Sequence, residues 1–344
     1  MRKLLNTLYV TTPEAYLGRD GENVVVREGE EDSFRIPIHN LEGVVCCGRQ
    51  GASPALMQLC AERDVALVFM TENGRFLARV VGETSGNVLL RRSQYRLADS
   101  PSGSLSYARS CIFGKVANAR HVLQRALRDH GDGADDMGDV QKAVDRMALQ
   151  LARLNRAADL DQLRGVEGEA ARTYFSVFDR LILAQKEDFS FDGRNRYPPR
   201  DRVNALLSFL YALLASDVRS ALETVGLDPA VGFLHRDRPG RPGLALDLME
   251  ELRPYLADRL ALTLINLRQV SGKGFDIRQP DSVRMDDDTR KAVLAAWQNR
   301  KREEVLHPYL KEKIALGLIP HVQALLMART IRGDLDAYPA FLCR

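Results

Sequence analysis

Three short segments of this chain contain side chains that could hold a divalent cation. Glu167 lies in the segment GVEGE (165–169), His235 lies between an apolar run and a basic loop, and Glu250 lies in LALDLMEELR (244–253). One imidazole with carboxylates makes an oxygen-dominated ligand set, which suits Mg²⁺ or Mn²⁺ and is poor for structural zinc. Such a cation could polarise a phosphodiester, activate a hydroxyl nucleophile and stabilise the leaving oxygen.

A fourth candidate, Asp247, belongs to the same segment as Glu250. On a helix these two acids are three positions apart, so both carboxylates project from nearly the same face. An ordinary solvated acidic face, with Glu250 paired to Arg253, would produce the same pattern. The segment alone therefore leaves both interpretations open.

Glu167 also has an ordinary explanation, because the helix dipole favours a carboxylate at a helix start. Gly165 and Gly168 are harder to explain in that way, since glycine weakens a helix. Close approach of another segment or of a ligand would account for them. Nothing in the sequence pattern itself brings Glu167 next to His235, which most often would be a satisfied core or loop histidine.

Two arginine-rich segments could contact phosphate groups. The predicted DNA-binding residues are Arg194, Arg196, Arg200, Arg202, Arg236, Arg238 and Arg241. Most charge runs are merely solvated, and the formal net charge of +3 gives no support of its own.

The elements that must position these residues fall into two predicted domains, an N-terminal β-rich domain over 1–87 and an all-α domain over 88–344. The fold class is therefore α+β. In the first domain Ser53 is a good N-cap and Pro54 a good first residue for a helix that extends to Glu62. Short apolar runs predict strands at Thr7–Val10, Val24–Arg27, Phe34–Ile38, Gly43–Cys47, Ala66–Met70 and Phe76–Val81.

In the second domain, apolar residues recur at three- and four-residue spacing, which is typical of helices. A polar, glycine-rich loop is expected over 129–139, and Phe275–Met285, which contains Pro280, should be irregular or a hairpin. The predicted helices include Arg164–Ala184, Asp201–Val225, Leu244–Leu267, Asp286–Arg300 and Glu303–Arg332.

The composition is that of an ordinary globular protein, with 45% apolar and 28% charged residues. Five cysteines without CxxC spacing indicate neither a zinc site nor a disulfide framework. No apolar stretch approaches the roughly 20 residues of a membrane span, and the N-terminus lacks a signal-peptide pattern. We therefore expect a cytoplasmic protein that does not contact a membrane.

Four segments, in this order, resemble the large subunit of the CRISPR spacer-acquisition integrase, in the variant found in type I-C systems. They are GVEGEAARTYF (165–175), RNRYPPRDRVNALLSFLYALL (194–214), VGFLHRDRPGR (231–241) and LALDLMEELRP (244–254). The resemblance spans both predicted domains. It implies that Glu167, His235 and Glu250 bind Mg²⁺ or Mn²⁺, that Asp247 assists in or near the site, and that Tyr174 is an aromatic close to it.

The implied activity is integration of short DNA fragments into a CRISPR array. A 3′-hydroxyl of the fragment attacks a phosphodiester at the leader–repeat boundary, and water in its place gives metal-dependent endonuclease activity. The resemblance further implies double-stranded DNA as substrate, a homodimer formed through the β domains, and a smaller partner subunit. Two other functions remain as alternatives: a non-catalytic helical scaffold that binds nucleic acid, and a metal hydrolase of a small phosphorylated molecule.

Overall fold

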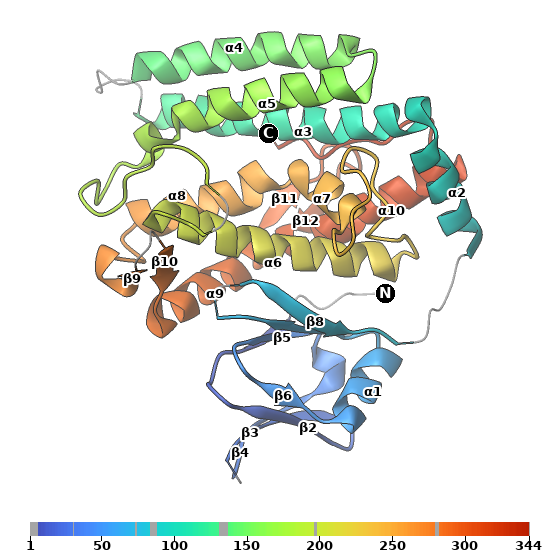
Figure 1. Cartoon of the computed structure of the whole chain (residues 1–344), viewed down its shortest axis with the longest axis vertical. Helices are drawn as coiled ribbons and strands as arrows, with labels where there is room; N and C mark the ends of the chain where they lie inside the picture. The colour runs from blue at the N-terminus through green and yellow to red at the C-terminus, as the bar shows by residue number, and fades with distance from the viewer. Residues whose placement is uncertain are drawn as a thin grey trace.

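The computed structural model of the chain describes residues 6–29, 31–72, 74–82, 88–130, 137–195, 198–278 and 282–343. A β-rich N-terminal domain lies against one side of a larger helical domain (Figure 1). The predicted α+β class is confirmed. The predicted boundary at residues 87 and 88 adjoins 83–87, which lie outside the described residues, so this boundary stays a prediction.

Two four-stranded sheets and one helix form the β domain. In one sheet β1, β5 and β7 are parallel and β8 is antiparallel; in the other β2, β3 and β4 form a meander with β6 at its edge. The elements are β1 (Thr7–Val10), β2 (Tyr16–Asp20), β3 (Asn23–Glu28), β4 (Glu31–Pro37), β5 (Gly43–Cys47), β6 (Gly51–Ala52), α1 (Pro54–Glu62), β7 (Ala66–Met70) and β8 (Phe76–Val80).

The six predicted strands and the predicted helix are all present. Ser53 caps α1 as expected, its side chain accepting a hydrogen bond from the backbone N–H of Leu56 at 3.2 Å. The sequence pattern predicts no strand at β2 or at β6. In β2, Gly18 lies within the strand, and Gly21, with φ of +57°, lies in the turn to β3.

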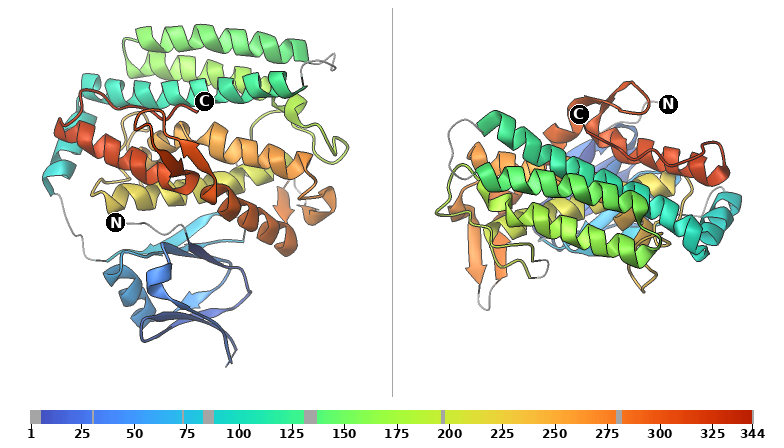
Figure 2. Two further views of the ribbon diagram at one scale, coloured as in Figure 1. Left: turned by 180° about the vertical axis from the view of Figure 1, so that it is seen from behind. Right: turned by 90° about the horizontal axis from the view of Figure 1, so that it is seen from above.

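The larger domain stacks its helices in layers (Figures 1 and 2). Its longest helix, α3, packs between α4 and α5 on one side and α7 on the other. The helices are α2 (Val88–Asp99), α3 (Pro101–His130), α4 (Met137–Arg156), α5 (Leu160–Ser176), α6 (Arg202–Thr224), α7 (Gly243–Glu250), α8 (Arg259–Asn266), α9 (Asp287–Arg302) and α10 (Ile319–Arg332).

Three predicted helices are wrong in part. The helix expected over Arg164–Ala184 is α5, which begins four residues earlier and ends at Ser176, so Glu167 lies within the helix and not at its start. The helix expected over Leu244–Leu267 is divided into α7, a π-helical turn at Arg253–Asp258 and α8. Pro254 is the second residue of that turn, and a proline has no N–H to continue the α-helical hydrogen bonds. The first half of the helix expected over Glu303–Arg332 is instead an antiparallel pair of strands, β11 (Glu304–Leu306) and β12 (Lys313–Ala315).

The larger domain is therefore mostly helical and not all-α. A second hairpin, β9 (Phe275–Arg278) with β10 (Ser282–Met285), occupies the segment expected to be irregular or a hairpin. The predicted 129–139 loop falls largely on 131–136, outside the described residues, between the end of α3 and the start of α4.

Helix α6 lies at the centre of the molecule, between the β domain and the other helices (Figure 1). Within the described part of the chain, it is the one helix long and apolar enough to span a membrane by length and composition alone. Its apolar residues form part of the protein core instead: Leu206, Leu210 and Leu214 are fully buried. A core helix is thus sufficient to explain this hydropathy.

Candidate active site

A cluster of acids and cations lies where α3, α5 and α7 meet. Lys115 from α3 forms ion pairs with both Glu167 of α5 and Glu250 of α7, the second over 2.8 Å from Nζ to Oε2. Arg253, one turn after Glu250, pairs with its Oε1 at 2.8 Å. The helices therefore bring together two predicted site residues that the sequence pattern could not place.

The cluster is protected from water. The Glu250 side chain is 5% exposed, that of Lys115 16% and that of Glu167 25%. Burial opposes ionisation of Glu250, but Arg253 and Lys115 outweigh it and lower its pKa to about 2. Burial likewise opposes the charge on Lys115, yet Glu250 and Glu167 raise its pKa. The predicted alternative of a solvated acidic face is thus wrong, although its Glu250–Arg253 pair exists.

The second part of the site joins His235 to Asp247. The Asp247 side chain is fully buried, and His235 Nδ1 lies 2.6 Å from its Oδ1. Because a carboxylate only accepts, Nδ1 carries the hydrogen and Nε2 is left as the lone-pair nitrogen. The carboxylate also accepts from three consecutive backbone N–H groups, those of Phe233, Leu234 and His235, at 2.6 to 3.0 Å.

Asp247 therefore acts as a positioning residue. Both of its oxygens are occupied by hydrogen bonds, so it orients the imidazole and the 233–235 loop rather than offering a free ligand atom.

Two glycines make this arrangement possible. A Cβ on Gly232 would lie 2.8 Å from Asp247 Oδ2, and one on Gly243 would lie 2.8 Å from the His235 carbonyl oxygen. Both distances are too short for any other residue type.

Among the described residues, no other segment closely approaches Gly165 or Gly168, so that part of the prediction is wrong; close approach of a ligand stays a prediction. An added Cβ at Gly165 meets nothing within 4 Å among the described atoms, and at Gly168 only the Arg172 guanidinium, at 3.8 Å. The sequence analysis chose the wrong glycines because any helical glycine is unfavourable, whether or not another segment is near.

The side chains fit a divalent cation in chemistry, although they are not yet arranged as a closed ligand set. Among the described residues, no three His, Cys, Asp or Glu side chains are grouped closely enough to hold a metal. However, Glu250 Oε2 is buried without a hydrogen-bond partner in the described structure, apart from its ion pair with Lys115. His235 is near enough that its protonated form lowers the pKa of Glu250. A buried carboxylate oxygen whose one described partner is a lysine ammonium, with an imidazole nearby, fits the chemistry of a divalent-cation site.

A cavity of about 310 Å³ opens next to Glu167 and Lys115. Within it Tyr211 donates to Asp258 at 2.6 Å, and the guanidinium groups of Arg194 and Arg253 lie 5.2 and 5.0 Å from the Tyr211 ring centroid. Burial raises the pKa of Asp258 to about 6. Tyr174 also lines the cavity, so the aromatic implied by the family resemblance does lie beside the cluster.

The predicted DNA-binding arginines have diverse environments. Arg194 donates to Asn204 at 2.7 Å, and Arg202 donates to the Asp188 carbonyl at 2.6 Å, so both stabilise the fold. Arg196 lies outside the described residues. The remaining members are exposed or half-buried: Arg200, Arg236, Arg238 and Arg241. Of these, Arg236 lies 3.6 Å from Asp161 in an exposed ion pair.

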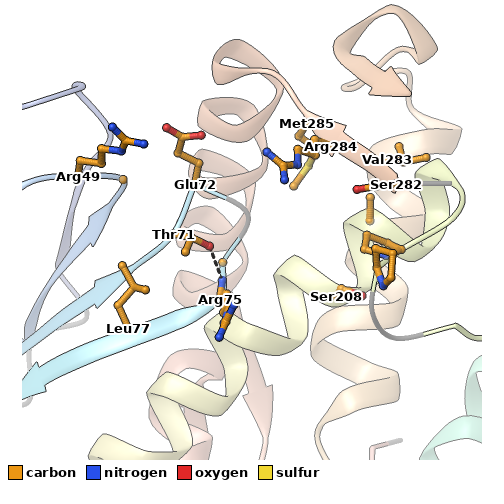
Figure 3. Close-up of a pocket in the computed structure, with 15 residues that line it drawn as sticks. Arg49, Thr71, Glu72, Arg75, Leu77, Ser208, Ser282, Val283, Arg284 and Met285 are labelled. Carbon is orange, nitrogen blue, oxygen red and sulfur yellow. Dashed lines mark hydrogen bonds between the residues drawn. The ribbon is translucent and has the colours of Figure 1, made fainter. Parts of the chain in front are cut away.

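A larger groove, of about 810 Å³, runs between the two domains (Figure 3). Its walls carry Arg49 and Arg75 from loops of the β domain and Arg284 from β10. All three are exposed, and none of their guanidinium groups has an ion-pair partner among the described residues. Glu72 is the acid between them. The sequence analysis missed these arginines because each is isolated in the sequence and only folding gathers them.

The fold and the site define a class: a two-domain α+β protein whose helical domain carries a buried acid–histidine cluster. The chain belongs to the family described as CRISPR associated protein Cas1, whose profile matches residues 8–299. It is 52% identical to a CRISPR-associated endonuclease Cas1 of Chlorobaculum tepidum, over 344 residues and the full length of both chains.

Two solved structures share the fold. One is a casposase bound to an integration product, with a TM-score of 0.83 and 19% identity, covering 97% of this chain and 93% of the casposase. The other is a Cas6-RT-Cas1–Cas2 complex, with a TM-score of 0.83 and 21% identity, covering 98% of this chain and 36% of that longer one. The family match and the 52% identity confirm the predicted family, that of the CRISPR spacer-acquisition integrase.

Proposed function

We propose that this protein is a divalent-metal-dependent DNA integrase and endonuclease. It inserts short DNA fragments into a CRISPR array by transesterification from a 3′-hydroxyl. The observation that carries the proposal is the buried Oε2 of Glu250, which shares the Lys115 ammonium with Glu167. Membership of the Cas1 family supports the reaction class.

Glu167, Glu250 and the Nε2 atom of His235 would hold Mg²⁺ or Mn²⁺. When bound, the cation supplies charge neutralisation to a phosphodiester and lowers the pKa of an attacking hydroxyl or water. Asp247 fixes the tautomer and the direction of the His235 ring. Arg253 holds Glu250 Oε1, so that the other oxygen alone points toward Glu167. Catalysis then depends mainly on positioning and charge.

We propose the interdomain groove as a DNA contact surface. Arg49, Arg75 and Arg284 can each pair with a backbone phosphate without breaking an ion pair within the described structure. Ser208 of α6 lines both this groove and the cavity next to Glu167, so the two spaces are neighbours. The exposed arginines of 236–241 form a second candidate contact.

The remaining features of the proposal come from the relatives. A complex containing Cas1 and Cas2 supports a small partner subunit, and a casposase with an integration product supports double-stranded DNA as substrate. We further propose a homodimer formed through the β domains and action in the cytoplasm without membrane contact. The five cysteines, all buried and unpaired, are compatible with a reducing compartment.

Strand transfer tests the proposal. A labelled duplex with free 3′-hydroxyl ends is incubated with supercoiled plasmid, the partner subunit, and Mn²⁺, Mg²⁺ or EDTA. Wild type is expected to join the strands only with a divalent cation, and His235→Ala or Glu167→Ala to lose joining while still binding DNA. Lys142→Met, a change at an exposed lysine far from the cluster, serves as the control.

Other outcomes point to the alternatives. DNA binding without joining or cutting under any metal and partner would indicate the scaffold function. Hydrolysis that is independent of duplex length would favour a small phosphorylated substrate.

The groove is tested by the salt dependence of DNA binding. Arg49→Ala or Arg284→Ala should each reduce the slope of log affinity against log salt concentration by about one.

A further inference from the structure

Lys115 occupies the position that a cation shared by two acids would take. Its Nζ contacts Glu167 Oε1 and lies 2.8 Å from Glu250 Oε2, and these acids come from different helices. We infer that Lys115 is a built-in counter-ion, which holds Glu167 and Glu250 together in the metal-free protein and is displaced when the divalent cation binds. This inference rests on the proposed function of the site.

The two carboxylates need such a partner. Like charges that share a buried site repel each other, and a buried charge left unpaired is strongly destabilising. Arg253 neutralises only Oε1 of Glu250. The remaining oxygen, Oε2, has Lys115 as its one ion-pair partner among the described residues. Among the described residues, only Lys115 forms ion pairs with both Glu167 and Glu250, so its loss would leave the two carboxylates without a shared partner.

Lys115 and a metal cannot share this position. An ammonium group has three donors and no lone pair, so it cannot be a ligand itself. The oxygens that face Nζ are those that a cation bridging Glu167 and Glu250 would need. A metal must therefore compete with the ammonium for these oxygens, and its affinity is reduced by that competition.

The structure provides room for Lys115 to move. The cavity of about 310 Å³ next to the cluster is lined by Lys115 itself together with Glu167 and Arg253. A lysine has a flexible four-carbon stem, so the ammonium can turn into this space while α3 stays in place. It would then remain beside the site as a positive charge, where the phosphate of a bound DNA strand can meet it.

Lys115→Met tests the inference with Mn²⁺ as the probe. Binding is followed by the electron paramagnetic resonance signal of free Mn²⁺, and stability by the thermal unfolding midpoint with and without the ion. We expect Lys115→Met to bind Mn²⁺ about tenfold tighter than wild type, or more, because a charge-assisted hydrogen bond no longer has to be broken. Its midpoint should be lower without Mn²⁺ and should rise further on binding.

Lys142→Met is the matched control. This lysine pairs with Asp139 at 3.0 Å and its side chain is 79% exposed, so its loss should leave Mn²⁺ affinity unchanged. If Lys115→Met does not fold, Lys115→Gln replaces it, since the neutral amide can still donate to both carboxylates. Tighter Mn²⁺ binding is expected for it as well.

Unchanged or weaker Mn²⁺ binding in the folded Lys115 variant would overturn the inference, provided that wild type binds the ion and Glu250→Gln does not. In that case the proposed metal site stands and only the role of Lys115 is wrong. If wild type itself neither binds Mn²⁺ nor joins DNA with it, the proposed function fails, and the counter-ion inference fails with it.

Discussion

Two neighbouring glutamates at the end of α7 belong to two very different regions. Glu250 faces the cations Lys115 and Arg253, and these lower its pKa to about 2. Glu251 faces the C-terminal segment, where only neutral groups meet it, and burial raises its pKa to about 8. Both residues are buried, at 3% and 0% exposure. The difference between their pKa values therefore comes from the groups that each carboxylate contacts and not from a difference in burial.

The region around Glu251 anchors the end of the chain. Its Oε1 accepts from Tyr338 at 2.6 Å and from Gln323 at 2.8 Å, and its Oε2 accepts from the backbone N–H of Phe341 at 3.1 Å. Asn118 completes this tail anchor: it donates to the carbonyls of Glu251 and Phe341 and accepts from the Cys343 N–H. One region is thus arranged to keep a charge and the other to avoid one.

The largest expected effect separates the two regions by activity. Glu250→Gln should lower metal-dependent strand joining and cutting by about 1,000-fold, because a neutral amide is a poor ligand and leaves Lys115 with a single acid. Glu251→Gln should remain within a few-fold of wild type. Rates on a labelled duplex with Mn²⁺ measure both. Equal losses in the two variants would break the distinction.

A smaller effect is expected at Asp247. The Asp247 carboxylate accepts hydrogen bonds from four donors, two at each oxygen. Asp247→Asn places an amide NH₂ against two of these donors, which weakens the support of the His235 ring and its loop. Loss of such a supporting group typically costs about 10- to 100-fold in metal affinity or activity. Mn²⁺ affinity and cutting rate should fall together. Wild-type values for both would show that His235 needs no such orientation.

On the tail anchor, the expected change is in stability. Asn118→Ala removes three buried hydrogen bonds and leaves backbone groups of the C-terminal segment unsatisfied, which should cost about 2 to 4 kcal/mol of unfolding free energy. Urea unfolding measures the loss. Strand joining per folded molecule, assayed well below the unfolding midpoint, should be nearly unchanged. A large loss of joining there would instead link the tail to the active site.

The smallest effect, counted per pH unit, is a dependence of stability on pH. The folded pKa of Glu251, about 8, lies above its ordinary value of 4.5, so the folded state binds the extra proton. Its contribution to stability is complete below pH 4.5 and is lost as the pH rises to 8, with a slope of at most about 1.4 kcal/mol per pH unit. Glu251→Gln should flatten that slope in urea unfolding curves. Parallel curves for wild type and variant would contradict the raised pKa.

Local chemistry explains what could be predicted. Ser53 and Pro54 begin α1 as expected because capping and proline geometry depend on neighbouring residues. The strands Gly43–Cys47 and Ala66–Met70 have the predicted bounds, since an apolar run between turn residues has few alternatives. The segment after Glu303 was predicted wrongly because its pairing, β11 with β12, is a contact between residues some ten positions apart.

The sequence by itself determined which residue types could bind a cation, and the family resemblance selected Glu167, His235 and Glu250 among them. Only the tertiary structure decided that Lys115 stands between two of these, that Asp247 supports His235, and that the exposed arginines meet at the domain junction. The reason is physical: charge partners and burial depend on which helices pack together, and residues far apart in sequence share no local signal. Glu250 and Glu251 are therefore indistinguishable in the sequence, whereas in the fold they have different partners and different pKa values.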